Sequence, residues 1–282
     1  MNERNVEKDS KTGIIMAIVA IIFGIFTIFI APFIIQINLN TLLSAIISLI
    51  PTDPHLQTAP IFVSIWVNIL RGVSVVSGIT LIVIALPLKK GEKWAWPAAI
   101  SCISLPTMYS VLIALPYIVH VGFPPPAGIV LILGLLSFWI MIILKSGSIL
   151  EKISRLIVLT LLGVTGGQIN VLVMHGIKGL VDTGFNLTDE SILDPKNFIY
   201  GFEVPLNFIA ISMIIVAIPL LADRRKLGWL LALIAGITII AANFPTHFIR
   251  LVTSDFLIAG ILGIILVVAL LIPQIKNNII QT

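Results

Sequence analysis

The chain alternates between long apolar runs and short polar segments. A helix of about 20 apolar residues crosses the hydrocarbon core of a bilayer, so runs of that length predict transmembrane helices. Eight such runs cover about residues 13–35, 59–88, 95–119, 126–144, 156–177, 204–222, 227–249 and 256–273. The fifth is the least regular, because Gln168, Asn170 and His175 interrupt it. The pattern predicts an all-α polytopic membrane protein with eight transmembrane helices.

Composition supports this class. Hydrophobic residues make up 58% of the chain and charged residues only 11%, whereas a soluble domain is about 25% charged. The net charge of +4 indicates no nucleic-acid partner, because the basic residues lie in short clusters between apolar runs. A single cysteine, Cys102, excludes an intramolecular disulfide and a cysteine-rich metal site. No metal or cofactor is expected.

The distribution of lysine and arginine predicts the orientation, since cytoplasmic loops are enriched in both. Thirteen lie on the side of the chain ends: Arg4, Lys8, Lys11, Lys89, Lys90, Lys93, Lys145, Lys152, Arg155, Arg224, Arg225, Lys226 and Lys276. The opposite side has only Lys178, Lys196 and Arg250, together with most of the acids outside the N-terminal tail. Both termini are therefore expected in the cytoplasm, and the protein in the cell (plasma) membrane.

Two segments of the chain resemble each other. "TLIVIALPLKKGEKWAW" (80–96) aligns with "SMIIVAIPLLADRRKLGW" (212–229), with Pro87 on Pro219 and, after a one-residue gap, Trp96 on Trp229. The match predicts two parallel four-helix repeats, 1–148 and 149–282, within one integral membrane unit. An axis along the membrane normal would relate them. The alternative is chance similarity between apolar segments.

Arg71 is the only charged residue inside the apolar run 59–88. The repeat alignment places it at the position of Glu203, and equivalent positions of a parallel repeat share a depth. We therefore expect a buried Arg71–Glu203 ion pair between the halves, because a carboxylate offsets much of the cost of a desolvated guanidinium. In the alternative, Arg71 extends to the outer headgroups and has no partner.

Further polar residues occur at the same depth. Asn68 and Arg71 share a helix face, as do Gln168 and His175. With Glu203 they predict an outward-facing polar cavity, so the candidate ligand-binding or ion-pair residues are Arg71, Glu203, Asn68, Gln168 and His175. Alternatively, Gln168 forms an interhelical hydrogen bond and His175 is solvated at the membrane surface. No catalytic residue is assigned.

Two segments between the apolar runs support further predictions. "NTLLSAIISLI" (40–50) places its large apolar residues on one face, which predicts an amphipathic helix lying on the outer membrane surface; a lid on the bundle is the alternative. "NLT" (186–188) matches a glycosylation acceptor, but chance occurrence is the favoured interpretation.

Three functions are compatible with these features. The favoured one is a non-catalytic membrane protein, such as a subunit, scaffold or sensor, in a homo- or hetero-oligomer. The second is a small transporter or permease-like protein for a polar or anionic small molecule or a lipid headgroup. An intramembrane lipid-modifying enzyme that uses His175 or Glu203 is the least favoured, since no P-loop, HExxH or GxSxG motif occurs.

Overall fold

The computed structural model describes the backbone of residues 3–182, 195–250 and 254–280. These residues are almost all helical and contain no strand. The predicted acceptor at 186–188 lies outside them. The elements are α1 (Glu3–Ile25), η1 (Phe26–Ile30), α2 (Ala31–Leu49), η2 (Pro54–Leu56), α3 (Ala59–Lys89), α4 (Ala95–His120), α5 (Gly128–Leu144), α6 (Ile149–Asp182), α8 (Pro195–Ala222), α9 (Lys226–Arg250), α10 (Asp255–Leu271) and α11 (Pro273–Ile279).

The length and apolar character of the helices identify a membrane protein. Six helices of the described chain are long and apolar enough to cross a bilayer, with α1, η1 and α2 counted together. A seventh is added if α10 and α11, which meet at a bend of 76°, form one span. The helix α5 is apolar but shorter. The fifth predicted run lies within the single helix α6, so the buried Gln168 and Asn170 do not interrupt it.

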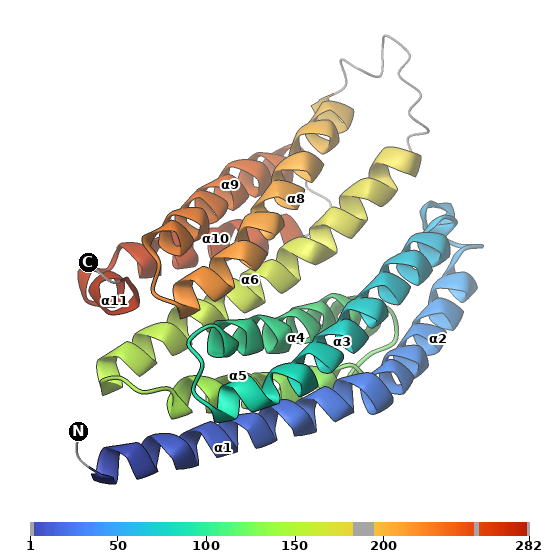
Figure 1. The fold of residues 1–282 in the computed structure, drawn as a ribbon. Coiled ribbons are helices and arrows are strands. Elements are labelled where there is room, and N and C mark those ends of the chain that lie inside the picture. Colours follow the sequence, from blue (N-terminus) through green and yellow to red (C-terminus); the bar gives the residue numbers. More distant parts are fainter. Residues whose placement is uncertain (1–2, 183–194, 251–253, 281–282) are drawn as a thin grey trace.

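The first helix is longer than its apolar run predicts. α1, the π-helical turn η1 and α2 follow one another without a break from Glu3 to Leu49, and they form the long blue helix of Figure 1. Pro32 lies just after the π turn and has no N–H to donate to the preceding turn. The prediction of a surface helix over 40–50 is therefore wrong. Leu42 and Ile46 are buried because α2 packs against α3 and α4.

The helices form two groups with the same pattern of neighbours. α1 packs on α3 and α5, and α6 packs on α8 and α10. Within each group the next helices also pack in order, α3 on α4 and α4 on α5, then α8 on α9 and α9 on α10. Figure 1 shows the first group, blue to green, below the second, yellow to red. The groups meet where α4 lies against α6 and α8.

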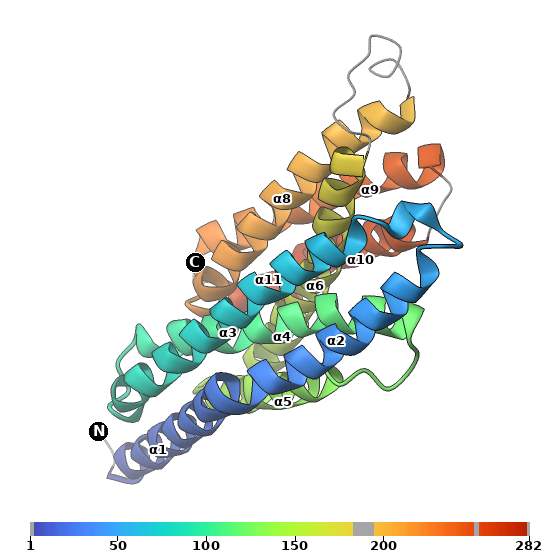
Figure 2. The ribbon, with the colours of Figure 1, turned by 90° about the vertical axis from the view of Figure 1, so that its right-hand side faces the viewer.

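The chain ends and the basic turns lie together. Figure 1 and Figure 2 place the N- and C-terminal marks at the same end of the bundle. The turns after α3, α5 and α8 lie at this end as well (Figure 1). We call it the basic end, since it carries Lys89, Lys90, Lys145, Arg224 and Arg225.

α1 and α3 approach each other closely at two glycines. A Cβ atom on Gly78 would lie only 2.7 Å from the carbonyl oxygen of Gly24 and would also collide with the Thr27 hydroxyl. Small residues at such a crossing let helix backbones pack without an intervening side chain. Gly72, two turns earlier on α3, has no atom within 4 Å of its Cβ position.

We expect Gly78→Ala to lower the free energy of unfolding in detergent by about 1–3 kcal/mol, because the added methyl group overpacks the α1–α3 contact. Gly72→Ala is the matched control on the same helix. It should leave stability unchanged or raise it, since alanine favours a helix by about 1 kcal/mol over glycine. Equal denaturation midpoints for the two variants would contradict this account of the crossing.

Candidate functional site

Arg71 on α3 has its partner on the first long helix. Its Nη2 donates a hydrogen bond to Oε1 of Gln36 on α2, and Gln36 Nε2 donates to Asn40 Oδ1 at 2.6 Å. The guanidinium Nε is buried and has no hydrogen-bond partner. Arg71 therefore ties α3 to α2 through a chain of polar side chains.

Glu203 lies in the other group of helices and is fully buried on α8. Its Oε1 accepts a hydrogen bond from Asn207, one turn further along the helix. Asn207 and Asn243 on α9 exchange side-chain hydrogen bonds of 3.2 and 2.9 Å. Glu203 Oε2 has no hydrogen-bond partner and faces Gly176 on α6, where a Cβ atom would lie 3.0 Å from it. Three helices thus meet around one carboxyl group.

The structure does not bring Arg71 and Glu203 together. If a two-fold axis related the halves, α4 would correspond to α9 and α6 to α1. A contact between α4 and α6 would then be repeated between α9 and α1. α4 does pack on α6, but the described residues show no comparable contact between α9 and α1. Because the interface between the halves is not reciprocal, equivalent positions do not face each other across an axis.

The other three predicted residues differ in exposure and in hydrogen-bond partner. Asn68 is exposed and donates to the carbonyl oxygen of Ser64 on its own helix, at 2.9 Å. Gln168 donates at 3.4 Å to the carbonyl oxygen of Asp255 and so joins α6 to the start of α10. His175 is exposed, with Asp255 among the charged groups near it. Gln168 and His175 thus both lie near Asp255, and Glu203 faces Gly176, the neighbour of His175 in the chain. Arg71 and Asn68 instead lie on α3.

Several residues that join helices do not appear among the sequence-based candidates. Asn38 on α2 is fully buried. Its Nδ2 donates at 3.3 Å to the carbonyl oxygen of Ile113 on α4, and its Oδ1 accepts at 3.2 Å from the backbone N–H of Ala127 before α5. Asn38 lies beyond the first apolar run, 13–35, so its sequence context gave no signal of burial. For Asn207 the signal was its four-residue spacing from Glu203.

Tryptophans also connect neighbouring helices. Trp66 on α3 donates to Asn170 Oδ1 on α6 at 3.1 Å and so links the two groups of helices. Trp139 on α5 donates to the Thr160 hydroxyl on α6 at 3.1 Å. Each indole N–H thus meets an acceptor on another helix, as a buried donor in an apolar environment requires.

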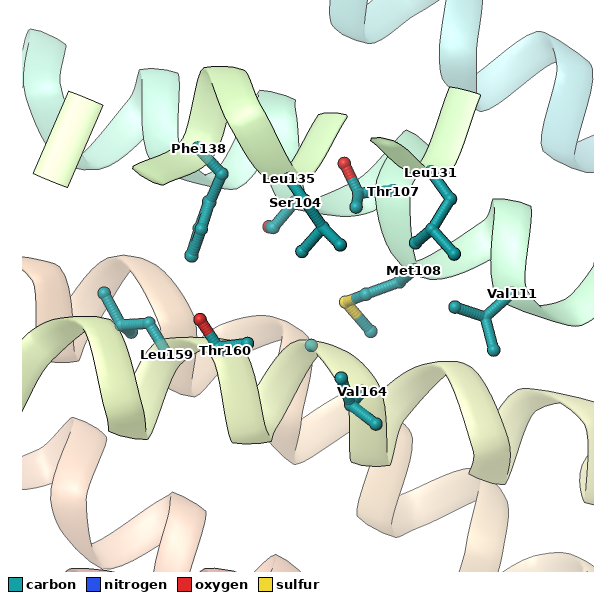
Figure 3. A pocket seen from close by; sticks show the side chains of 11 residues that line it. Ser104, Thr107, Met108, Val111, Leu131, Leu135, Phe138, Leu159, Thr160 and Val164 are labelled. Carbon is teal, nitrogen blue, oxygen red and sulfur yellow. The ribbon is translucent and has the colours of Figure 1, made fainter. Parts of the chain in front are cut away.

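A cleft opens between α4, α5 and α6 (Figure 3). Its lining comes from Ser104, Thr107, Met108, Val111, Leu131, Leu135, Phe138, Leu159, Thr160, Gly163 and Val164. The Ser104 and Thr107 hydroxyls donate to carbonyl oxygens of their own helix at 3.0 and 2.7 Å. Val164 is 41% exposed at the rim. The cleft therefore offers an apolar surface that opens sideways from the bundle, suited to a hydrocarbon chain rather than a polar ligand. We call it the lateral cleft.

The described residues include no group of three or more His, Cys, Asp or Glu side chains that could hold a metal ion. Comparison of the chain with models of known protein families, with curated proteins and with solved structures finds no match. Function is therefore inferred from the contacts of the chain's own residues.

We expect Asn207→Ala to lower the free energy of unfolding by about 1–3 kcal/mol, because it removes the α8–α9 hydrogen bonds and the partner of the buried Glu203 Oε1. Unfolding by a graded mixture of mild and denaturing detergent measures this change. Asn68→Ala is the control and should stay within about 0.5 kcal/mol of the unmodified protein, since its side chain is exposed. A stable Asn207→Ala protein would show that the asparagine pair does not hold α8 to α9.

Proposed function

We propose that the protein is a non-catalytic integral membrane protein, a subunit, scaffold or sensor, whose polar residues hold its helices together. The observation that carries this proposal is the separate placement of those residues. Arg71, Gln168 and Asn207 each bond to a different helix, at three different places. A transport or catalytic site would instead gather them around one space.

We further infer eight passes in two parallel four-helix repeats. The helices α5 and α10 each have 17 residues, and a helix of that length spans about 25 Å, near the lower limit for crossing a bilayer. The equivalent tryptophans support the repeat. Trp96 donates to the Met141 carbonyl oxygen on α5 at 3.1 Å, and Trp229 donates to that of Leu270 on α10 at 2.9 Å. Each ring also lies under a lysine ammonium, at 5.1 and 4.4 Å.

A second pair of equivalent contacts supports the same arrangement. Gly134 on α5 packs against Thr107 on α4, and Gly263 on α10 packs against Ile240 on α9. Thr107 and Ile240 are separated by the same number of residues as Trp96 and Trp229. The two glycines are separated by the same number of residues as Met141 and Leu270. With the basic end in the cytoplasm, both termini would lie on the cytoplasmic side of the plasma membrane.

One observation favours a different function, a small transporter for a polar molecule. Glu203 is fully buried, and its Oε2 has no hydrogen-bond partner. Ionisable residues within membrane helices commonly mark substrate or ion pathways. This oxygen packs so closely against Gly176 that a Cβ atom there would collide with Val204 Cγ2. A ligand with a hydrogen-bond donor would therefore bind it only if α6 and α8 moved apart.

The variant Glu203→Gln separates the two proposals. Glutamine keeps an oxygen that accepts from Asn207 but removes the acidic group, so the α8–α9 contacts should persist. If the protein is non-catalytic, the purified variant should carry the same small molecules as the unmodified protein, by mass spectrometry, with equal or higher thermal stability. A polar molecule that copurifies with the unmodified protein and is lost from a stably folded variant would favour the transporter.

A further inference from the structure

Arg155, near the start of α6, is a buried cation without a hydrogen-bonded partner. Its side chain is only 4% exposed. Both Nε and Nη1 are buried, and neither has a hydrogen-bond partner. A guanidinium stays charged under all ordinary conditions, and a buried charge is normally paired. These donors are available to an anion.

A second cation lies beside it over the same aromatic ring. The Arg155 Cζ atom is 5.7 Å from the centre of the Trp96 ring, and the Lys145 Nζ atom is 5.1 Å from it. Burial first, and then the positive charge of Arg155, lower the pKa of the Lys145 ammonium, while Asp223 raises it. The two like charges are held together by their contact with one tryptophan.

The nearest acids are occupied by other arginines. Glu151 forms an ion pair with Arg224 at 3.0 Å, and Asp223 forms one with Arg225 at 2.7 Å. Each of these carboxylates forms its ion pair with another cation, although the charge of Glu151 also acts on Arg155 and that of Asp223 on Lys145. Among the described side chains, the pair keeps an excess of positive charge that an anion would compensate.

The lateral cleft continues from this cationic pair into the bundle. Leu159 follows Arg155 by four residues on α6, and Phe138 precedes Lys145 by seven on α5, so each lies on the same helix face as its cation. Both line the cleft. From Arg155 to Val164, the last lining residue on α6, the helix rises about 14 Å, which is half of a hydrocarbon core of about 30 Å. The cationic pair and the cleft together therefore cover about the depth of one leaflet.

We propose that this surface binds one anionic phospholipid from the leaflet at the basic end. Its phosphate would bind Arg155 and Lys145 in front of Trp96, and one acyl chain would lie in the lateral cleft of Figure 3. Basic groups between membrane helices at the cytoplasmic side are suited to acidic headgroups. The site holds whether the protein is a structural subunit or a transporter, because it shares no residue with the Glu203 cluster.

The test is native mass spectrometry of the full-length protein in detergent, titrated with dioleoyl phosphatidylglycerol, dioleoyl phosphatidylcholine or inorganic phosphate. We expect phosphatidylglycerol to bind at least about fivefold more tightly than phosphatidylcholine, and the preference to be lost in Arg155→Gln and in Lys145→Gln. Lys152→Gln is the control, because its ammonium donates to the Ile143 carbonyl oxygen at the same end and should retain the preference.

A cleft variant separates the lipid from a free anion. Gly163 lines the cleft, and the nearest atom to its Cβ position is 3.9 Å away, an ordinary contact. Gly163→Leu should therefore occupy part of the cleft and weaken phosphatidylglycerol binding without removing any charge. If Arg155→Gln does not fold, the phosphatidylglycerol binding of Lys145→Gln and Gly163→Leu tests the proposal. Unchanged phosphatidylglycerol binding in these two variants, equal affinity for both lipids, or binding of inorganic phosphate in place of phosphatidylglycerol would each overturn the proposal.

Discussion

The structure depends on one constraint of the bilayer, which supplies no hydrogen-bonding groups to a polar side chain within its core. Such a side chain must find its partner within the protein, on its own helix or on another. Arg71 finds Gln36, Trp66 finds Asn170, and Asn207 finds Asn243. Close packing at small residues, as between Gly24 and Gly78, adds contacts that lipid cannot replace. These ties determine which helices are neighbours.

The same constraint distinguishes the half-buried Arg71 from the buried Arg155. Arg71 is satisfied in part by an amide that its neighbouring helix provides. Arg155 has no such amide, and the acids near it are paired elsewhere. Arg71 is therefore part of the helix packing, and Arg155 belongs to the surface for which we propose a lipid ligand. Their sequence contexts suggested the opposite assignment, because Arg71 lies within an apolar run and Arg155 lies in a basic cluster.

The helices were predictable because each apolar run is long and the polar segments between them are short. The long α6 was also predictable, although Gln168 and Asn170 interrupt its run. The partner of Arg71 was not, because Gln36 lies beyond the first run and meets α3 only if the helix continues through η1 into α2. The placement of Glu203 depends on how the two groups of helices pack. A sequence alignment of repeats carries no information on that packing.

If the polar residues of the apolar helices tie the helices together, Arg71 and Gln36 should be energetically coupled, and a double-mutant cycle measures that coupling. The free energy of unfolding would be measured in lipid bicelles for Arg71→Ala, Gln36→Ala and the double variant. We expect a coupling of about 0.6–2 kcal/mol, the range found for interhelical hydrogen bonds in membranes. Strictly additive effects of the two substitutions would contradict it.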